Sequence, residues 1–87
     1  MMGEKILFSL ENCIKCTQTK DLMKNRNDIQ ILTYPHEIDQ WNKDQIELAK
    51  TYDVLDDLKK TAPVLIIGKE KKIGYLRIRK WIQDNMK

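Results

Sequence analysis

Two cysteines separated by two residues are the clearest candidates for chemistry in this chain. They are its only cysteines, and they form a single C-x-x-C sequence, Cys13-Ile14-Lys15-Cys16. Two thiols at this spacing can reduce disulfides, because one thiolate attacks a disulfide sulfur and the other then resolves the mixed disulfide. The same pair can also supply half of a metal site that another chain completes. The remaining interpretation is two ordinary cysteines on a helix.

A redox pair needs one ionised thiol and a second thiol within reach. A free thiol has a pKa near ~8.5, and a place in the first turn of a helix lowers it. We expect Asn12, a good helix N-cap, to place Cys13 in that turn, and Lys15 adds a nearby positive charge. The pattern therefore predicts that Cys13 is the exposed nucleophile of low pKa. Cys16, one turn further on and more buried, is predicted to be the resolving thiol.

The elements around the cysteines are expected to alternate between strands and helices. Apolar runs and alternation predict strands at Lys5–Leu10, Ile29–Tyr34, Val64–Ile67 and, more briefly, Lys72-Ile73. Helices are expected from about Cys13 to Asn25, from about Asp39 to Tyr52, and along a final stripe of Tyr75, Ile78, Ile82 and Met86 joined by Trp81.

Two connecting segments complete this pattern. Asp53–Thr61 is expected to be a loop or one helical turn, and Lys69-Glu70-Lys71 is expected to be the turn of a hairpin. The resulting order is β-α-β-α-β-β-α. The first βαβ unit implies parallel strands with a right-handed crossover, and the hairpin adds antiparallel strands. The sequence thus predicts an α/β fold with a four-stranded mixed sheet flanked by helices.

Length and composition restrict the class of protein. A chain of 87 residues is short of the usual domain size of about 100–150 residues, so we expect one domain over residues 1–87. With 41% hydrophobic and 33% charged residues the chain is globular, and a net charge of +3 is too mild to argue for nucleic acid. It has no apolar run of the ~20 residues that span a membrane, and no signal-peptide pattern. We expect a monomeric cytoplasmic protein without a membrane or nucleic-acid partner.

A second candidate motif, Thr61-Ala62-Pro63-Val64, stands immediately before the third expected strand. A proline at the start of a strand is tolerated because no ladder hydrogen bond is lost there. The common trans isomer would make it a simple strand opener. A cis-proline packed against the cysteine pair is the functional interpretation, because it leaves neighbouring backbone groups free to pair with an extended substrate.

Together these segments resemble the glutaredoxin branch of the thioredoxin superfamily. The similarity lies in KILFSL-EN-CIKC, in TAPVLII, in KKIGYL and in the final amphipathic helix, and it covers essentially the whole chain. It implies a thioredoxin-like, glutaredoxin-type fold and a dithiol carrier that reduces protein disulfides through Cys13 and Cys16. Ribonucleotide reductase is a client of that family. The resemblance implies no bound cofactor, and it implies glutathione or a thioredoxin-reductase-type enzyme as the electron donor.

The resemblance also implies where substrate binds. By analogy Pro63 is cis, and the backbone of Ala62 hydrogen-bonds to a bound peptide or glutathione. The substrate-binding residues that it implies are Lys15, Thr61, Ala62, Pro63, Gly74 and Tyr75.

This chain differs from the family pattern at two places. Ile14-Lys15 stands between the cysteines, where glutaredoxins commonly have Pro-Tyr. Gly74-Tyr75 stands where the family has two glycines, and Leu76 and Arg77 follow where the family has an acid that holds the amino group of glutathione. We therefore expect protein disulfides to be better substrates than glutathione mixed disulfides.

Alternatives to a redox enzyme stay open at this point. One is a metal or iron–sulfur binding module, and another is a thioredoxin-fold interaction domain without turnover. Residues 69–87 also hold seven Lys or Arg and two acids. A solvated hairpin turn and an outer helix face account for that excess, and a docking face for an acidic partner or a phosphate is the alternative.

Overall fold

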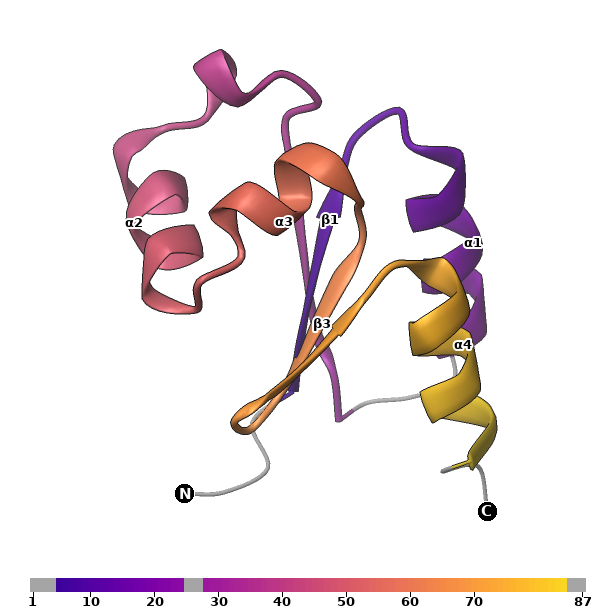
Figure 1. Ribbon diagram of the computed structural model, residues 1–87. Coiled ribbons are helices and arrows are strands. Elements are labelled where there is room, and N and C mark those ends of the chain that lie inside the picture. The colour runs from indigo at the N-terminus through magenta and orange to yellow at the C-terminus, as the bar shows by residue number, and fades with distance from the viewer. Residues whose placement is uncertain (1–4, 25–27, 85–87) are drawn as a thin grey trace.

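A computed structural model describes residues 5–24 and 28–84 (Figure 1). Its strands are β1 (Lys5–Leu10), β2 (Gln30–Tyr34), β3 (Val64–Ile67) and β4 (Glu70–Ile73). Its helices are α1 (Ile14–Met23), α2 (Lys43–Thr51), α3 (Leu55–Lys60) and α4 (Tyr75–Asp84), with a short 3-10 helix η1 at Ile38–Gln40. Within these ranges no helix combines the length and the apolar character needed to cross a membrane.

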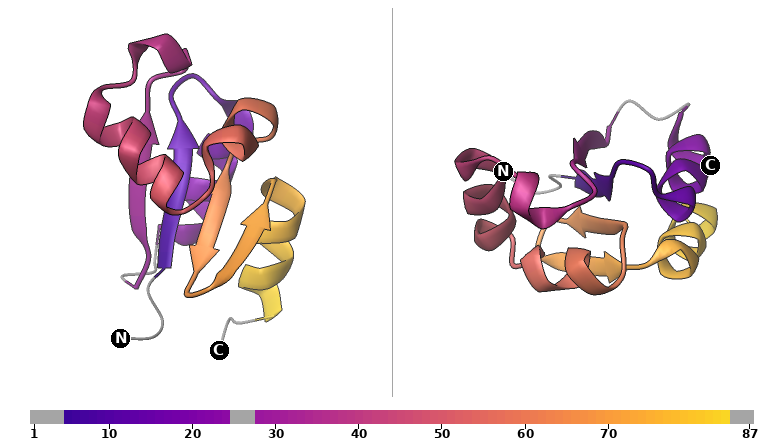
Figure 2. Two further views of the ribbon diagram at one scale, coloured as in Figure 1. Left: turned by 60° about the vertical axis from the view of Figure 1, so that its left-hand side comes forward. Right: turned by 90° about the horizontal axis from the view of Figure 1, so that it is seen from above.

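The four strands form one mixed sheet in the order β2-β1-β3-β4. Strand β1 runs parallel to β2 and antiparallel to β3, and β3 pairs antiparallel with β4. The predicted parallel βαβ unit, the hairpin and the four-stranded mixed sheet are therefore confirmed. Helices α1 and α4 lie together on one face of the sheet, and α2 and α3 cover the other face (Figures 1 and 2).

Alternating side chains of the central strands build a separate core on each face. One core comprises Ile6, Phe8, Tyr34, Trp41, Ala49, Val54, Leu58, Val64 and Ile66, under α2 and α3. The other comprises Leu7, Met23, Ile29, Leu65, Ile78 and Ile82, under α1 and α4. Strands β1 and β3 carry apolar side chains on both faces. Burial of each such side chain stabilises the fold by about 1.5–3 kcal/mol. The sheet thus holds α1, which carries the cysteines, firmly against α4.

The prediction of a single helix from Asp39 to Tyr52 is wrong, because the helical conformation ends after η1 and resumes at α2. Trp41 is extended, with φ −71° and ψ 139°, and buries its ring in the core, while its Nε1 donates to the carbonyl of Pro35 at 2.8 Å. Helix α2 then starts at a capping box. The Asn42 side chain accepts from the backbone N–H of Gln45, and the Gln45 side chain accepts from the backbone N–H of Asn42. The apolar residues at helical spacing around Trp41 thus belong to two separate helices, η1 and α2, and to the extended residue between them.

Other element boundaries also differ from the expectation. The hairpin turn lies at Gly68-Lys69, where Gly68 has φ +58°, so Glu70 and Lys71 belong to β4 and not to the turn. The segment expected as a loop or one helical turn contains α3. The expected ends of the first and last helices at Asn25 and Met86 fall outside the described residues. Trp81, which was expected to join the apolar stripe of the last helix, is half-buried against the α1–α4 core.

Candidate functional site

Cys13 itself caps the first helix. The prediction that Asn12 is the cap is wrong: Asn12 turns the chain with φ +54°, in a left-handed conformation that asparagine tolerates, and Cys13 is the extended residue before α1. The Cys13 Sγ accepts a hydrogen bond from the backbone N–H of Cys16 at 3.2 Å. Sulfur thus takes the place of the usual capping oxygen, directly at the positive end of the helix dipole.

Cys16 is the buried member of the pair, as predicted. Its side chain is 1% exposed, and its Sγ accepts a hydrogen bond from the backbone N–H of Leu10 at 3.4 Å. Burial, supported by the hydrogen bond to Cys13, raises the pKa of the Cys16 thiol from 9.0 to about 12. Cys13 is only partly buried, and both residues are free cysteines. The pair therefore has one accessible sulfur and one sulfur that stays protonated at neutral pH.

A polar chain that sequence reasoning missed runs beside Cys16. The Lys20 ammonium donates to the Thr33 hydroxyl at 2.7 Å, and Thr33 Oγ1 lies 3.3 Å from Ser9 Oγ. Ser9 donates its own proton to the carbonyl of Leu32 at 2.9 Å, so Thr33 is the donor to Ser9. The charge of Lys20 acts to lower the pKa of Cys16, against the effect of burial. Lys20 and Cys16 are four residues apart on α1, which was the available sequence signal.

The loop before β3 lies against the start of α4. The Ala62–Pro63 peptide bond is cis, as the resemblance implied, and Pro63 is fully buried. The Pro63 carbonyl accepts a hydrogen bond from the backbone N–H of Gly74 at 2.9 Å. A Cβ on Gly74, which has φ +93°, would come within 3.3 Å of the Thr61 methyl group. Pairing of β3 with β4 thus brings two segments of the expected binding site into contact.

An open cavity of about 390 Å³ gathers most of the predicted substrate-binding residues. Its lining contains Lys15, Thr61, Gly74 and Tyr75, all of which were predicted, together with Ile73, Leu76 and Arg77. Lys15 places this cavity at the cysteine end of α1. Pro63 and the partly buried Ala62 follow Thr61 in the chain but are not part of the lining. Leu76 and Arg77 had been noted only as departures from a family pattern, and the structure adds them to the cavity wall.

Cys13 opens onto a different hollow on the outer side of α1. This shallow depression of about 420 Å³ is lined by Asn12, Cys13, Ile14, Thr17 and Gln18. Ile14 is 78% exposed, which is unusual for a large apolar side chain. A substrate that reaches the Cys13 sulfur therefore meets an exposed apolar residue next to it.

Thiol exchange is the chemistry that this arrangement can perform. Among residues 5–24 and 28–84, no group of three or more His, Cys, Asp or Glu side chains gathers as metal ligands would. The described part of one chain supplies two thiols in unequal environments beside a cavity. Comparisons with protein-family models, with curated proteins and with solved structures found no match.

Proposed function

We propose that the protein is a glutaredoxin-like thiol–disulfide oxidoreductase, a cytoplasmic monomer that reduces protein disulfides through Cys13 and Cys16. The observation that carries the proposal is the asymmetry of the pair: a partly exposed sulfur at a helix N-terminus, bonded to the N–H of a residue whose own sulfur is buried. The order of the sheet and the helices on both faces are compatible with a thioredoxin-like fold.

The first step of the proposed reaction is attack by Cys13. Its thiolate forms a bond to one sulfur of the substrate disulfide, and the other substrate sulfur leaves as a thiolate. The N–H of Cys16 and the N-terminus of α1 point at the Cys13 sulfur, so they stabilise negative charge there. This step joins the substrate to Cys13 by a mixed disulfide.

The second step is resolution by Cys16. Its thiol loses a proton, the thiolate attacks the Cys13 sulfur, and the second substrate sulfur leaves as a thiolate that takes up a proton. The substrate has then gained two electrons, and the protein holds a Cys13–Cys16 disulfide. Two molecules of glutathione, which become one glutathione disulfide, or the dithiol of a thioredoxin-reductase-type enzyme return it to the dithiol form.

The cavity beside the pair supports binding of an extended substrate segment. Among the described residues, the backbone hydrogen bonds outside helices and strands include none to Ala62, whereas Thr61 donates to Asp57 and Pro63 accepts from Gly74. We propose that the backbone of Ala62 pairs with the substrate segment next to its disulfide. Ribonucleotide reductase is the client that the resemblance favours.

Reduction of insulin by dithiothreitol tests the function. The native chain should accelerate the reaction, and Cys13→Ser should abolish the acceleration because the attacking sulfur is lost. Cys16→Ser should still attack and should accumulate a mixed disulfide that mass spectrometry detects. Asp21→Asn, a change at an exposed residue of the same helix that lines neither hollow, is the matched control. Equal activity of the native chain and Cys13→Ser would refute the proposal.

A further inference from the structure

We propose that a basic trough beside the cysteine pair docks an acidic segment of the substrate protein. The trough consists of two hollows that share Arg77. One is the 390 Å³ cavity described above, and the other, of about 230 Å³, is lined by Lys72, Arg77, Lys80, Trp81 and Asp84. The inference rests on the proposed function and names its substrate class: disulfides flanked by Asp and Glu.

Positive charge dominates the trough. Its lining holds Lys15, Lys72, Arg77 and Lys80 against the single acid Asp84. Lys72 lies 3.6 Å from Glu70, but in the described part of the chain no ion pair engages Lys15, Arg77 or Lys80. These three side chains are exposed. The trough is therefore a surface whose positive charge the neighbouring residues leave largely uncompensated.

The carboxylates of α3 and of the segment between α2 and α3 pair with a different lysine, Lys71. Lys71 Nζ lies 2.7 Å from Asp57 and 3.6 Å from Asp53, and it also donates to the Asp53 carbonyl at 2.7 Å. Asp57 belongs to α3, on the face of the sheet opposite α4 (Figure 2). Consecutive residues of β4 point to opposite faces, so Lys71 is neutralised on the α3 side while Lys72 faces the trough. The difference in charge between the two faces of the sheet therefore follows from the alternation of side chains along β4.

The surroundings of the trough favour a protein segment as its occupant. Leu76 is 72% exposed on the wall of the first cavity, and Ile14 is exposed at the cysteine end of α1. A polypeptide offers apolar and acidic side chains together, which matches this mixture. A single-stranded nucleic acid would instead use exposed aromatic faces for base stacking, whereas the two aromatic residues of the lining, Tyr75 and Trp81, are half-buried.

Docking of this kind acts mainly on the rate of association. Exposed opposite charges steer the encounter, and salt screens them within about 10 Å at 0.1 M ionic strength. The trough should therefore raise kcat/KM for acidic substrates at low salt and lose that effect at high salt. Attack by Cys13 and resolution by Cys16 should keep their rates once the complex has formed.

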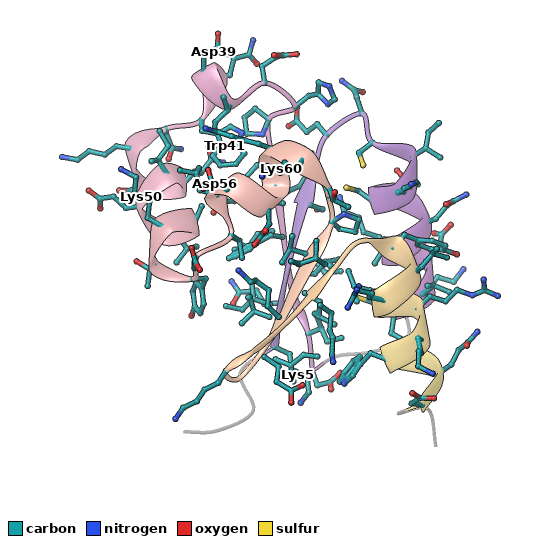
Figure 3. All side chains as sticks on the ribbon, in the orientation of Figure 1. Lys5, Asp39, Trp41, Lys50, Asp56 and Lys60 are labelled. Atoms are coloured by element: carbon teal, nitrogen blue, oxygen red, sulfur yellow. The ribbon has the colours of Figure 1, made fainter. Side chains whose placement is uncertain are left out.

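Three disulfide peptides that differ only in a tail of glutamate, glutamine or lysine residues test the proposal. With dithiothreitol as donor, kcat/KM for the glutamate peptide should exceed that for the glutamine peptide by about tenfold at low ionic strength. Arg77→Gln and Lys80→Gln should each reduce this preference by about twofold to fivefold. Lys50→Gln is the matched control, because Lys50 is an exposed lysine of α2 that projects away from α4 (Figure 3).

A binding measurement separates the trough from the redox function. A cysteine-free glutamate peptide is titrated calorimetrically into the Cys13→Ser/Cys16→Ser protein, with a single-stranded oligonucleotide as competitor. Salt-sensitive binding that requires Arg77 and Lys80 supports the trough even if no peptide is reduced, an outcome that would refute only the redox function. Equal reduction of all three peptides, absence of peptide binding, or tighter binding of the oligonucleotide would each overturn the trough.

Discussion

The cysteine that matters most for pH dependence is the buried one. Burial raises the pKa of Cys16 from 9.0 to about 12, so between these values the folded chain keeps a proton that the unfolded chain has lost. The contribution of the protonated Cys16 thiol to the free energy of unfolding is fully present below pH 9.0, and it is lost as the pH rises toward about 12.

Urea unfolding at alkaline pH measures this effect. In a Cys13→Ser background under reducing conditions, the free energy of unfolding should fall between pH 9 and 11 by up to about 1.4 kcal/mol per pH unit. A Cys13→Ser/Cys16→Ser variant corrects for the lysines and tyrosines that titrate in the same range. Identical pH profiles for the two proteins would show that the Cys16 thiol is not perturbed.

Lys20 is expected to assist the resolving step. Its ammonium is held by Thr33 and favours the Cys16 thiolate, so Lys20→Met should raise the pKa of Cys16 further. Resolution of the mixed disulfide should then slow by about twofold to fivefold, while attack by Cys13 stays unchanged. Rapid-quench kinetics separate the two steps. Lys24→Met, at the far end of the same helix, is the control, and equal slowing by both variants would refute a specific role for Lys20.

At the scale of the elements, the start of α2 depends on its capping box. Asn42→Ala removes the side-chain oxygen that accepts from the N–H of Gln45, and should lower the free energy of unfolding by about 0.5–2 kcal/mol. Asn42→Asp keeps an acceptor and should recover most of the loss. Insulin reduction should be unaffected, because α2 lies on the sheet face opposite the cysteines. Thermal unfolding followed by circular dichroism tests this prediction, and equal stability of the alanine and aspartate variants would contradict it.

Sequence patterns located strands better than helix ends, for a physical reason. Lys5–Leu10 and Val64–Ile67 match β1 and β3 to the residue, because a strand buried on both faces is a continuous apolar run. Helix ends depend on single side chains instead. The spacing Asn42-x-x-Gln45 was a readable capping signal, but the apolar stripe through Trp41 concealed it.

The candidate site was predicted only in part, because its cavity is non-local. The roles of the two cysteines followed from position along one helix, and their unequal burial agrees with them. The cavity also requires Thr61 to meet Gly74, which depends on the register of β3 with β4. No local pattern specifies that register or adds Arg77 to the wall. The resemblance supplied most of the cavity residues, and the strand pairing supplied the rest.

At the scale of the whole molecule, the positive charge of the cavity should favour protein disulfides over glutathione mixed disulfides as substrates. Arg77 lines the cavity where glutathione would bind by resemblance, and the ammonium of glutathione would meet a like charge there. Protein disulfides should therefore be reduced faster than a glutathionylated small disulfide, and Arg77→Glu should narrow the difference. Turnover on both substrates over a range of ionic strength measures it. Efficient glutathione-dependent turnover that is insensitive to Arg77→Glu would contradict this expectation.

The division of the interior into two cores has a consequence for how the chain tolerates change. Both walls of the site, α1 and α4, rest on the same small core, whereas α2 and α3 rest on the other. Truncation of Leu65 or Ile78 would loosen the packing that holds Cys13 and the basic trough at a fixed separation, so backbone amides of α1 and α4 should lose hydrogen-exchange protection together. Helix α3 is the exception on its face, because its Asp57 carbonyl accepts a hydrogen bond from the N–H of Thr61 in the cavity wall. The exposed surface of α2 is therefore the part of the fold that can vary most without moving the cysteines or the cavity.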